Sequence, residues 1–284
     1  MNNIVYLNGN YTEAKNATIS IFDRGLLFGD SIYEVIPVYN GTPCFVDRHL
    51  QRLNSNLDKI KIQKPDLDWL SIINQLIQLN GKSDMQIYLQ VTRGNQGVRK
   101  HDIPKDIDPF SFAFTMHTAY SSDEEKRRGL SASIIDDTRW LRCDIKATTL
   151  LSNVLLNDEA VCAGDQTALL VRNGFLTEGT VSNVFIVDDK GTIKTPPLSN
   201  YCLPGITRQL VIELIKELNL PFSEEAIPEA DILSAQEVMI TSTSKEIYPV
   251  TQVNQQKIGN GVGGPCWEKL NTNFHKLVES CYDR

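Results

Sequence analysis

The sequence predicts an α+β protein with two domains, and three observations support this prediction. The chain has 284 residues, of which 41% are hydrophobic and 22% charged, a composition typical of globular proteins. Strand-like alternation and helix-like spacing of apolar residues occur in both halves of the chain. The polar stretch AYSSDEEKRRG separates the halves. We therefore expect an N-terminal α+β domain at 1–118, a linker at 119–129 and a C-terminal domain at 130–284.

The N-terminal half is expected to contain both strands and helices. Alternating apolar residues predict strands at 4–9, 18–23, 31–41, 85–91 and 110–116. The dipeptide Asn40-Gly41 is typical of a two-residue hairpin turn. Leucines and isoleucines at helical spacing predict a helix at 47–62 and a second that starts near Asp66 and ends before Gly81.

The C-terminal half repeats this mixture. We expect strands at 131–137, 167–173, 182–189 and 237–241, and helices at 206–219 and 264–281. A further helix is expected directly after Lys146. Its apolar residues are spaced for one buried face, and they are Leu150, Leu151, Val154, Leu155 and Val161.

Charge and composition exclude several classes of function. The formal net charge of −7 and the pI near 5.2 leave no basic surface for nucleic acid. No apolar run reaches the ~18 residues that cross a bilayer. We expect no signal peptide, because the N-terminal residues MNNIVYLNGN show neither a basic region nor an apolar core. The six cysteines and four histidines show no metal-ligand spacing, so we expect a cytoplasmic protein without a bound metal.

Lys146 is the first candidate for chemistry, because it lies between the strand at 131–137 and an apolar helix. Lysine is normally a surface residue, and that is the ordinary interpretation of any single lysine. A cation near a helix N-terminus, however, opposes the helix dipole. A lysine in a partly desolvated site can attack a carbonyl group to form a Schiff base.

Glu178 is the second candidate, in an expected turn between two strand-like stretches. The ordinary interpretation is a solvated turn residue. A pyridoxal phosphate (PLP) enzyme instead needs an anion against the pyridine nitrogen, which keeps the ring protonated as an electron sink.

Two further stretches could bind a phosphate. LPGITR at 203–208 begins a helix whose first backbone N–H groups are available to an anion. ITSTSKEI at 240–247 gathers hydroxyl side chains after a strand. Helix capping and turn formation explain either stretch equally well. The glycine-rich nucleotide loops GxGxxG and GxxxxGK[ST] do not occur.

These stretches, in this order, resemble the fold-type IV PLP-dependent aminotransferases. The similarity covers nearly the whole chain, and within the family it is strongest to the D-amino-acid transaminases. It is carried by FDRGLLFGDSIYEV at 22–35, DRHLQRL at 47–53, RWLRCDIK at 139–146, TEGTVSNVF at 177–185, GITR at 205–208 and TSTSKEI at 241–247. The resemblance implies two α/β-type domains with the cofactor in the cleft between them.

The resemblance also implies a role for each site residue. Lys146 would form the Schiff base with PLP and move the substrate proton, and Glu178 would pair with the pyridinium nitrogen. Leu203 would pack against the cofactor ring. The phosphate would be held by Arg52, Ile206, Thr207, Ser242 and Thr243. The substrate α-carboxylate would be bound by Tyr33, Arg99 and His101.

The implied activity is transfer of the amino group of a D-amino acid similar to D-alanine to a 2-oxo acid such as 2-oxoglutarate. The resemblance further implies a homodimer. Three alternatives remain open: an L-branched-chain aminotransferase, an aminodeoxychorismate lyase of the same fold, and a PLP-binding protein without catalysis. The Arg-x-His spacing of residues 99–101 favours the D-specific enzymes among these.

Overall fold

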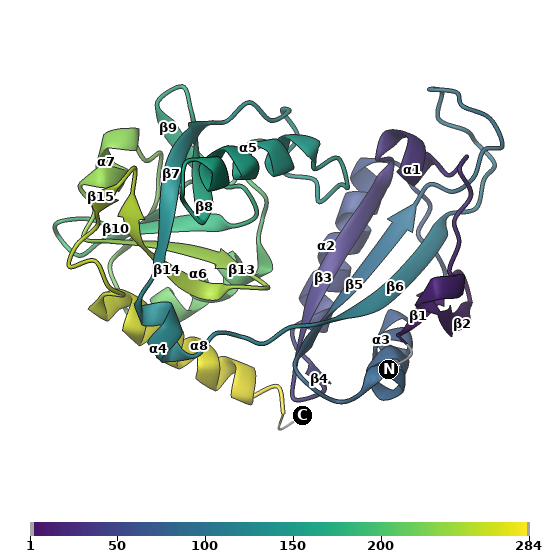
Figure 1. Cartoon of the computed structure of the whole chain (residues 1–284), viewed down its shortest axis with the longest axis horizontal. Helices are drawn as coiled ribbons and strands as arrows, with labels where there is room; N and C mark the ends of the chain where they lie inside the picture. The colour runs from purple at the N-terminus through teal and green to yellow at the C-terminus, as the bar shows by residue number, and fades with distance from the viewer. Residues whose placement is uncertain (1–2, 283–284) are drawn as a thin grey trace. The chain divides into compact units, whose positions relative to one another are not determined.

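The computed structural model describes residues 3–282, which form two compact units. The first unit contains the chain up to Ala119, residues Ile145–Thr149 and the end from Cys281. The second contains Tyr120–Asp144 and Leu150–Ser280. Each unit combines its own β-sheet with helices (Figure 1). The expected α+β class is therefore confirmed.

The first unit has a six-stranded antiparallel sheet in the order β2-β1-β6-β5-β3-β4. Its strands are β1 (Ile4–Leu7), β2 (Asn10–Glu13), β3 (Ser31–Tyr39), β4 (Thr42–Pro43), β5 (Met85–Thr92) and β6 (Phe110–His117). Its helices are η1 (Ala14–Asn16), α1 (Arg24–Phe28), α2 (Val46–Lys59) and α3 (Trp69–Asn80). The expected turn at Asn40-Gly41 joins β3 to β4, with positive φ at both residues (48° and 77°).

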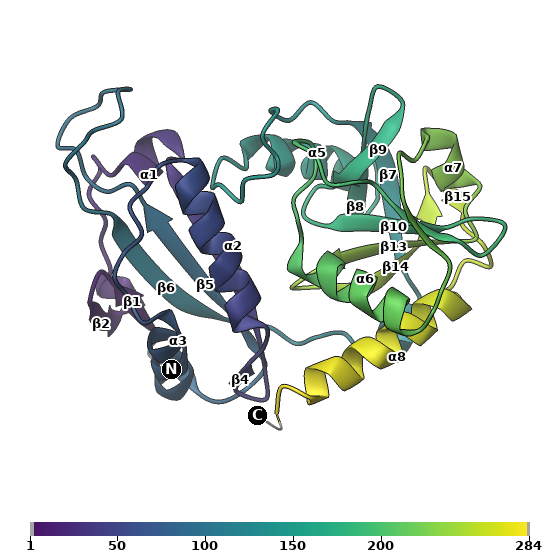
Figure 2. The same cartoon turned by 180° about the vertical axis from the view of Figure 1, so that it is seen from behind.

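The two faces of this sheet carry different side chains. Helices α2 and α3 cover one face, where Ile32, Ile36 and Ile87 pack against the helices in a buried core (Figure 2). Alternate residues point the other way, as strand geometry requires. On that second face Tyr33 stacks on Tyr88, with the ring centroids 5.5 Å apart.

The second unit has a nine-stranded mixed sheet in the order β12-β11-β10-β13-β14-β7-β8-β9, with β15 paired to β14. Strand β7 lies parallel to both of its neighbours. The strands are β7 (Leu130–Asp136), β8 (Thr167–Arg172), β9 (Phe175–Gly179), β10 (Asn183–Val187), β11 (Ile193–Thr195), β12 (Phe222–Glu224), β13 (Glu237–Ser242), β14 (Glu246–Val253) and β15 (Gln256–Lys257). The helices are α4 (Asp123–Arg127), α5 (Leu151–Cys162), α6 (Ile206–Glu217), α7 (Glu229–Leu233) and α8 (Pro265–Glu279).

One expected strand needs correction, and the expected linker contains a short helix. Residues 18–23 are not a strand, although TISIF alternates: they lie outside the sheet, and Ile21 is 69% exposed. A strand needs a hydrogen-bonded neighbour, which this segment lacks apart from a single bridge at Asp23. Residues 119–129 are not an open linker throughout, because a capping box at Ser122 starts helix α4 and Lys126 is buried.

Helix α5 also differs from its expected packing. Leu156 and Ala160 are its buried residues, and they pack on β7 and β8. The residues expected on the buried face are exposed instead: Leu151 (71%), Val154 (60%), Leu155 (60%) and Val161 (52%). Helix α5 therefore presents an apolar surface, formed by these four residues, outside the core of its unit.

Among residues 3–282, no helix combines the length and apolar character needed to cross a membrane.

Candidate active site

Lys146 is held against strand β3 of the first unit. Its carbonyl oxygen accepts a hydrogen bond from the Tyr33 amide (3.1 Å), and its own amide donates to Asn56 Oδ1 (3.2 Å). The next residue, Ala147, forms a β-bridge with Ile32. The Lys146 Nζ atom lies 4.1 Å from the centre of the Tyr33 ring. The backbone of this lysine is thus fixed, and its half-buried amine lies over an aromatic face.

A buried cluster on β3 and α2 surrounds Arg52. Glu34 accepts two hydrogen bonds from the Arg52 guanidinium (2.7 and 2.8 Å) and one from His49 Nδ1 (2.8 Å). Asn56 donates to the Arg52 carbonyl oxygen (2.7 Å), so a single amide side chain connects the backbones of Arg52 and Lys146. The planar fork of Arg52 is therefore fixed by a carboxylate of matching geometry.

This cluster has a defined charge state. Burial alone would raise the pKa of Glu34, but the attraction and hydrogen bonds of Arg52 outweigh it and lower the pKa to about 2. Burial lowers the pKa of His49, which favours the neutral ring. At neutral pH the cluster is an ion pair of Glu34 and Arg52 with a neutral histidine beside it.

Arg99 and His101 lie in the loop between β5 and β6, and both are exposed. They meet at the ring of Phe28: the Arg99 guanidinium is 5.2 Å from its centroid, and the His101 ring centroid is 5.3 Å away. The structure thus brings these two residues together. The third expected carboxylate-binding residue, Tyr33, lies on β3 against Lys146.

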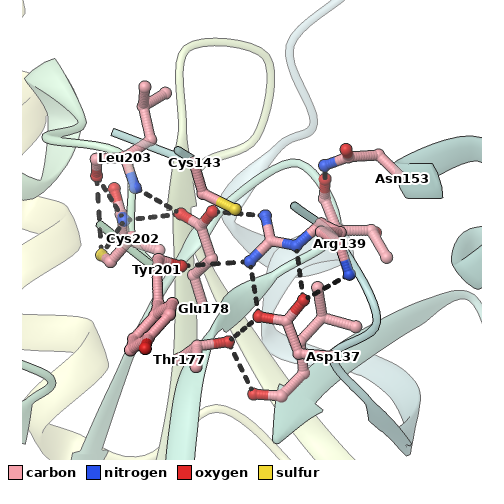
Figure 3. Close-up of polar contacts among 12 residues, drawn as sticks. Asp137, Arg139, Cys143, Asn153, Thr177, Glu178, Tyr201, Cys202 and Leu203 are labelled. Atoms are coloured by element: carbon pink, nitrogen blue, oxygen red, sulfur yellow. Dashed lines mark hydrogen bonds and ion pairs between the residues drawn. The ribbon is translucent and has the colours of Figure 1, made fainter. Parts of the chain in front are cut away.

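Glu178 is buried, which corrects the ordinary interpretation of a solvated turn residue. It lies in strand β9, where it is 5% exposed. Its Oε1 atom accepts a hydrogen bond from Arg139 Nη1 (2.6 Å). Its Oε2 atom accepts from the Leu203 amide (3.0 Å), as Figure 3 shows, and from Asn183 Nδ2 (3.3 Å). Three donors on separate segments therefore fix this carboxylate.

Arg139 is itself oriented by a second carboxylate. Asp137 accepts from its Nε and Nη2 atoms (2.9 and 3.0 Å), and the Tyr201 carbonyl oxygen accepts from Nη2 (3.1 Å). Arg172 and Thr177 donate to Asp137 in turn (3.0 and 2.8 Å). The result is a row of alternating charges, from Arg172 through Asp137 and Arg139 to Glu178. Figure 3 shows the last three of these residues.

Burial and the neighbouring arginine act on Glu178 in opposite directions. Burial raises its pKa and is the larger effect, whereas Arg139 and the Leu203 amide lower it. For Arg139, burial is outweighed by its two carboxylates, and its pKa is raised. Arg139 thus stays charged and limits the cost of holding Glu178 as an anion.

The start of helix α6 offers backbone donors to an anion. The N-cap residue is Gly205, so no side chain caps the N–H groups of the first turn. A Cβ atom at this position would collide with the Asn183 side-chain oxygen, which explains the glycine. Ile206 and Thr207 occupy the first turn, and both are buried.

Hydroxyl groups lie at the end of strand β13, against which α6 packs. Ser242 ends the strand, and its Oγ accepts from the Lys245 amide (3.1 Å), while Thr243 follows in the turn to β14. The buried Thr241 Oγ has no hydrogen-bond partner in the described part of the chain. Such a group favours a polar ligand or water beside it.

Comparison with known proteins identifies the family. The family model "Amino-transferase class IV" matches residues 31–253. The chain belongs to the class IV aminotransferases. This class IV aminotransferase is 39% identical over 278 residues to a D-alanine aminotransferase of Bacillus licheniformis, covering 97% of both chains. It is 35% identical to a D-alanine aminotransferase of Staphylococcus haemolyticus, covering 97% of this chain and 98% of that relative.

Solved structures share the fold. A branched-chain amino acid aminotransferase of Escherichia coli superposes with a TM-score of 0.88 at 25% identity, covering 98% of this chain and 95% of that one. A second branched-chain amino acid aminotransferase, from T.th. and with pyridoxamine 5'-phosphate, gives 0.89 at 24% identity, covering 98% and 94%. The expected fold-type IV aminotransferase fold, with its two sheets, is thereby confirmed.

Several residues of the candidate site of this class IV aminotransferase were not predicted from the sequence. Glu34, His49 and Asn56 around Arg52, and Asp137, Arg139 and Asn183 around Glu178, all lie in or beside the motifs that carry the resemblance. One signal was present for Glu34, because it is a charged residue on the apolar face of a strand.

Proposed function

We propose that this class IV aminotransferase uses PLP to transfer the amino group of a D-amino acid such as D-alanine to a 2-oxo acid such as 2-oxoglutarate. The observation that carries the proposal is the placement of Lys146, whose backbone is fixed to β3 and α2 and whose amine lies over Tyr33. The full-length similarity to D-alanine aminotransferases supports the choice of substrate.

The residues present fit PLP in three chemical respects. Lys146 supplies a primary amine for the aldehyde carbon, and Glu178 supplies a buried anion for the ring nitrogen. The uncapped first turn of α6 supplies donors for the phosphate. When bound, PLP draws electrons from the substrate Cα, so that the proton on this carbon becomes acidic.

Each candidate residue then has one task. Lys146 would hold the cofactor through its amine, and the same amine would carry the Cα proton of the substrate. Glu178 keeps the ring nitrogen protonated, and Leu203 packs on the ring. The phosphate is held by Arg52, Ile206, Thr207, Ser242 and Thr243.

Tyr33, Arg99 and His101 bind the substrate α-carboxylate in this proposal. A guanidinium can hold a carboxylate with two parallel hydrogen bonds, and a histidine beside it adds a third donor. With the carboxylate fixed at these residues, the α-hydrogen of a D-amino acid, and not that of the L-isomer, faces Lys146.

We further propose that the enzyme acts in the cytoplasm as a homodimer. The apolar surface of α5, formed by Leu151, Val154, Leu155 and Val161, supports the dimer, because each of these side chains is more than half exposed in the single chain.

One experiment tests the central proposal. The purified enzyme is assayed with D- and L-alanine and D- and L-leucine as donors and 2-oxoglutarate as acceptor. We expect turnover with D-alanine and little with either L-amino acid. Faster turnover of L-leucine than of D-alanine would identify an L-branched-chain enzyme instead. Absence of any amino transfer, with PLP bound, would leave the aminodeoxychorismate lyase and the PLP-binding protein without catalysis.

A further inference from the structure

Helix α1 presents two side chains to the loop between β5 and β6. Arg24 and Phe28 are its first and last residues, four positions apart, and therefore lie on one face of the helix. Asp23 caps the start by accepting from the Gly25 amide (2.7 Å), and Gly29 ends the helix at φ 65°. Figures 1 and 2 both show α1 next to this loop.

The Arg24 guanidinium makes a cluster of hydrogen bonds to the loop. Its Nη1 atom donates to the Gln96 side chain (2.7 Å) and to the carbonyl oxygens of Lys100 (2.6 Å) and Asp102 (3.3 Å). Its Nη2 atom donates to the His101 carbonyl oxygen (3.4 Å). These acceptors lie immediately around Arg99 and include His101 itself.

The charge of Arg24 is compensated inside the unit. The side chain is 4% exposed, and its Nε atom donates to Asp30 (2.8 Å). Asp30 thus binds the guanidinium on one edge, and the loop carbonyls bind the other edges. A planar group with five donors can make this set of contacts, whereas a lysine ammonium cannot.

Phe28 completes the arrangement. Its ring is contacted by Arg99 (5.2 Å to the centroid), by His101 (5.3 Å between centroids) and by Arg24 (4.8 Å). The two candidate carboxylate-binding side chains are otherwise exposed and belong to an irregular loop at 93–109. Without the contacts to Phe28, the Arg99 and His101 side chains would become ordered only when substrate binds. The entropy lost at that moment would weaken substrate binding.

We infer that Arg24 and Phe28 are positioning residues, which hold the loop so that Arg99 and His101 are pre-arranged for a substrate carboxylate. Arg24 fixes the backbone that follows Arg99 and the Gln96 side chain before it, and Phe28 contacts both the Arg99 and the His101 side chain. The inference rests on the proposed function, because it takes carboxylate binding by Arg99 and His101 as given. The further point is that residues of helix α1 determine how the loop presents Arg99 and His101 to the substrate.

Arg93 is a matched control for the loss of a buried arginine. It is 5% exposed, against 4% for Arg24, and it binds the same carboxylate, Asp30, through Nε and Nη2 (2.7 and 2.9 Å). Its other acceptors are the carbonyl oxygens of Ile60 and Lys61 (both 2.6 Å), which lie outside the loop. Arg93→Met therefore removes an equivalent charge at the start of the loop, while the contacts of Arg24 with residues 96–102 stay in place.

The test compares Arg24→Met, Phe28→Leu and Arg93→Met as PLP-bound enzymes. We expect Arg24→Met and Phe28→Leu to raise KM for D-alanine and for the 2-oxo acid about tenfold, which corresponds to about 1.4 kcal/mol. The absorbance of the resting enzyme should not change. Hydrogen exchange of the peptide covering 95–102 should accelerate in Arg24→Met but not in Arg93→Met, whatever the change in Tm.

Arg99→Ala distinguishes the inference from the proposed function. If Arg99→Ala leaves KM unchanged, the carboxylate role in the proposed function is wrong. If Arg99→Ala raises KM while Arg24→Met and Phe28→Leu do not, or if Arg93→Met raises it equally, the inference is overturned. Phe28→Leu should raise KM by a smaller factor in an Arg99→Ala background than in the wild type, because only its contact with His101 is then left to lose.

A third variant covers the case in which Arg24→Met does not fold. Gln96→Leu removes one of the loop contacts without removing a buried charge. It should accelerate exchange at 95–102 and raise KM by a smaller factor than Phe28→Leu does. Wild-type exchange and wild-type KM in both Gln96→Leu and Phe28→Leu would overturn the inference.

Discussion

The amine of Lys146 is the group on which the chemistry depends. Its backbone is anchored by hydrogen bonds to Tyr33 and Asn56, and neither bond involves the amine. The donors proposed for the phosphate lie on other elements. Covalent attachment and phosphate binding should therefore be separable by mutation.

Lys146→Ala should abolish turnover, because no other group supplies both the covalent attachment and the transfer of the Cα proton. The variant should still bind PLP through its phosphate. Borohydride reduction of the wild-type enzyme followed by peptide mapping checks the assignment directly. A reduced pyridoxyl group on any lysine other than Lys146 would contradict it.

Glu178→Gln should slow transamination about a thousandfold, which corresponds to about 4 kcal/mol at 1.4 kcal/mol per factor of ten. A neutral amide cannot keep the pyridine nitrogen protonated. Glu237→Gln is the matched control, because Glu237 is a second buried glutamate of the same unit that accepts backbone N–H bonds from Cys266 and Trp267 (2.8 Å each). Its kcat should remain near wild type, and equal losses in the two variants would remove the special role of Glu178.

The residues that support Lys146 and Glu178 could not be assigned from sequence, and the reason is distance along the chain. Glu34 meets Arg52 across 18 positions, and Arg139 meets Glu178 across 39. Periodicity reports which face of a strand or helix is buried, but not which charged residue it will face. All four residues lie within the family motifs, but the motifs do not show that these residues form ion pairs with one another.

Among whole elements, helix α5 shows what periodicity can and cannot predict. Its existence and approximate bounds follow from the spacing of its apolar residues. That spacing also predicts a buried face, but the helix has apolar residues on more than one side, and Leu156 and Ala160 make the contact with the sheet. The prediction of a strand at 18–23 was wrong for a related reason. Alternation of apolar and polar residues does not show whether a neighbouring strand is present for hydrogen bonding.

Leu155→Glu should weaken the proposed homodimer, because it places a charge within the apolar surface of α5, where Leu155 is 60% exposed. Light scattering after size-exclusion chromatography should give the mass of a dimer for the wild type and a lower mass for the variant at micromolar concentration. Leu79→Glu serves as the control, because Leu79 is an exposed leucine of α3, outside this surface. A dimer that survives Leu155→Glu unchanged would exclude this surface as the interface.

Over the whole molecule, both units rely on carboxylates that are paired with arginine below the surface. Asp30 binds Arg24 and Arg93, Glu34 binds Arg52, and Asp137 binds Arg139 and Arg172. Burial alone would raise the pKa of each carboxyl group, but the arginine hydrogen bonds and charges outweigh it, so that all three pKa values are lowered. Removing one of these carboxylates would leave its arginines buried without that counter-charge.

The free energy of unfolding should therefore decrease steeply as the pH falls below about 4.5. The pKa of Glu34 is lowered from 4.5 to about 2 in the folded protein. Between these values the unfolded chain binds more protons, so acid favours unfolding, and the stabilisation is fully present only above the unfolded pKa. At 1.36 kcal/mol per pKa unit, Glu34 alone contributes about 3 kcal/mol, with Asp30 and Asp137 adding in the same direction.

Urea unfolding of the apoprotein, followed by tryptophan fluorescence at pH 7, 5, 4 and 3, measures this dependence without interference from PLP release. Glu34→Gln supplies the internal comparison. It should be less stable than the wild type at pH 7, because Arg52 then lacks its buried counter-charge, yet it should lose less stability between pH 4.5 and 3, because the group that titrates there is gone. Equal losses in the two proteins over this range would show that Glu34 does not set the acid sensitivity.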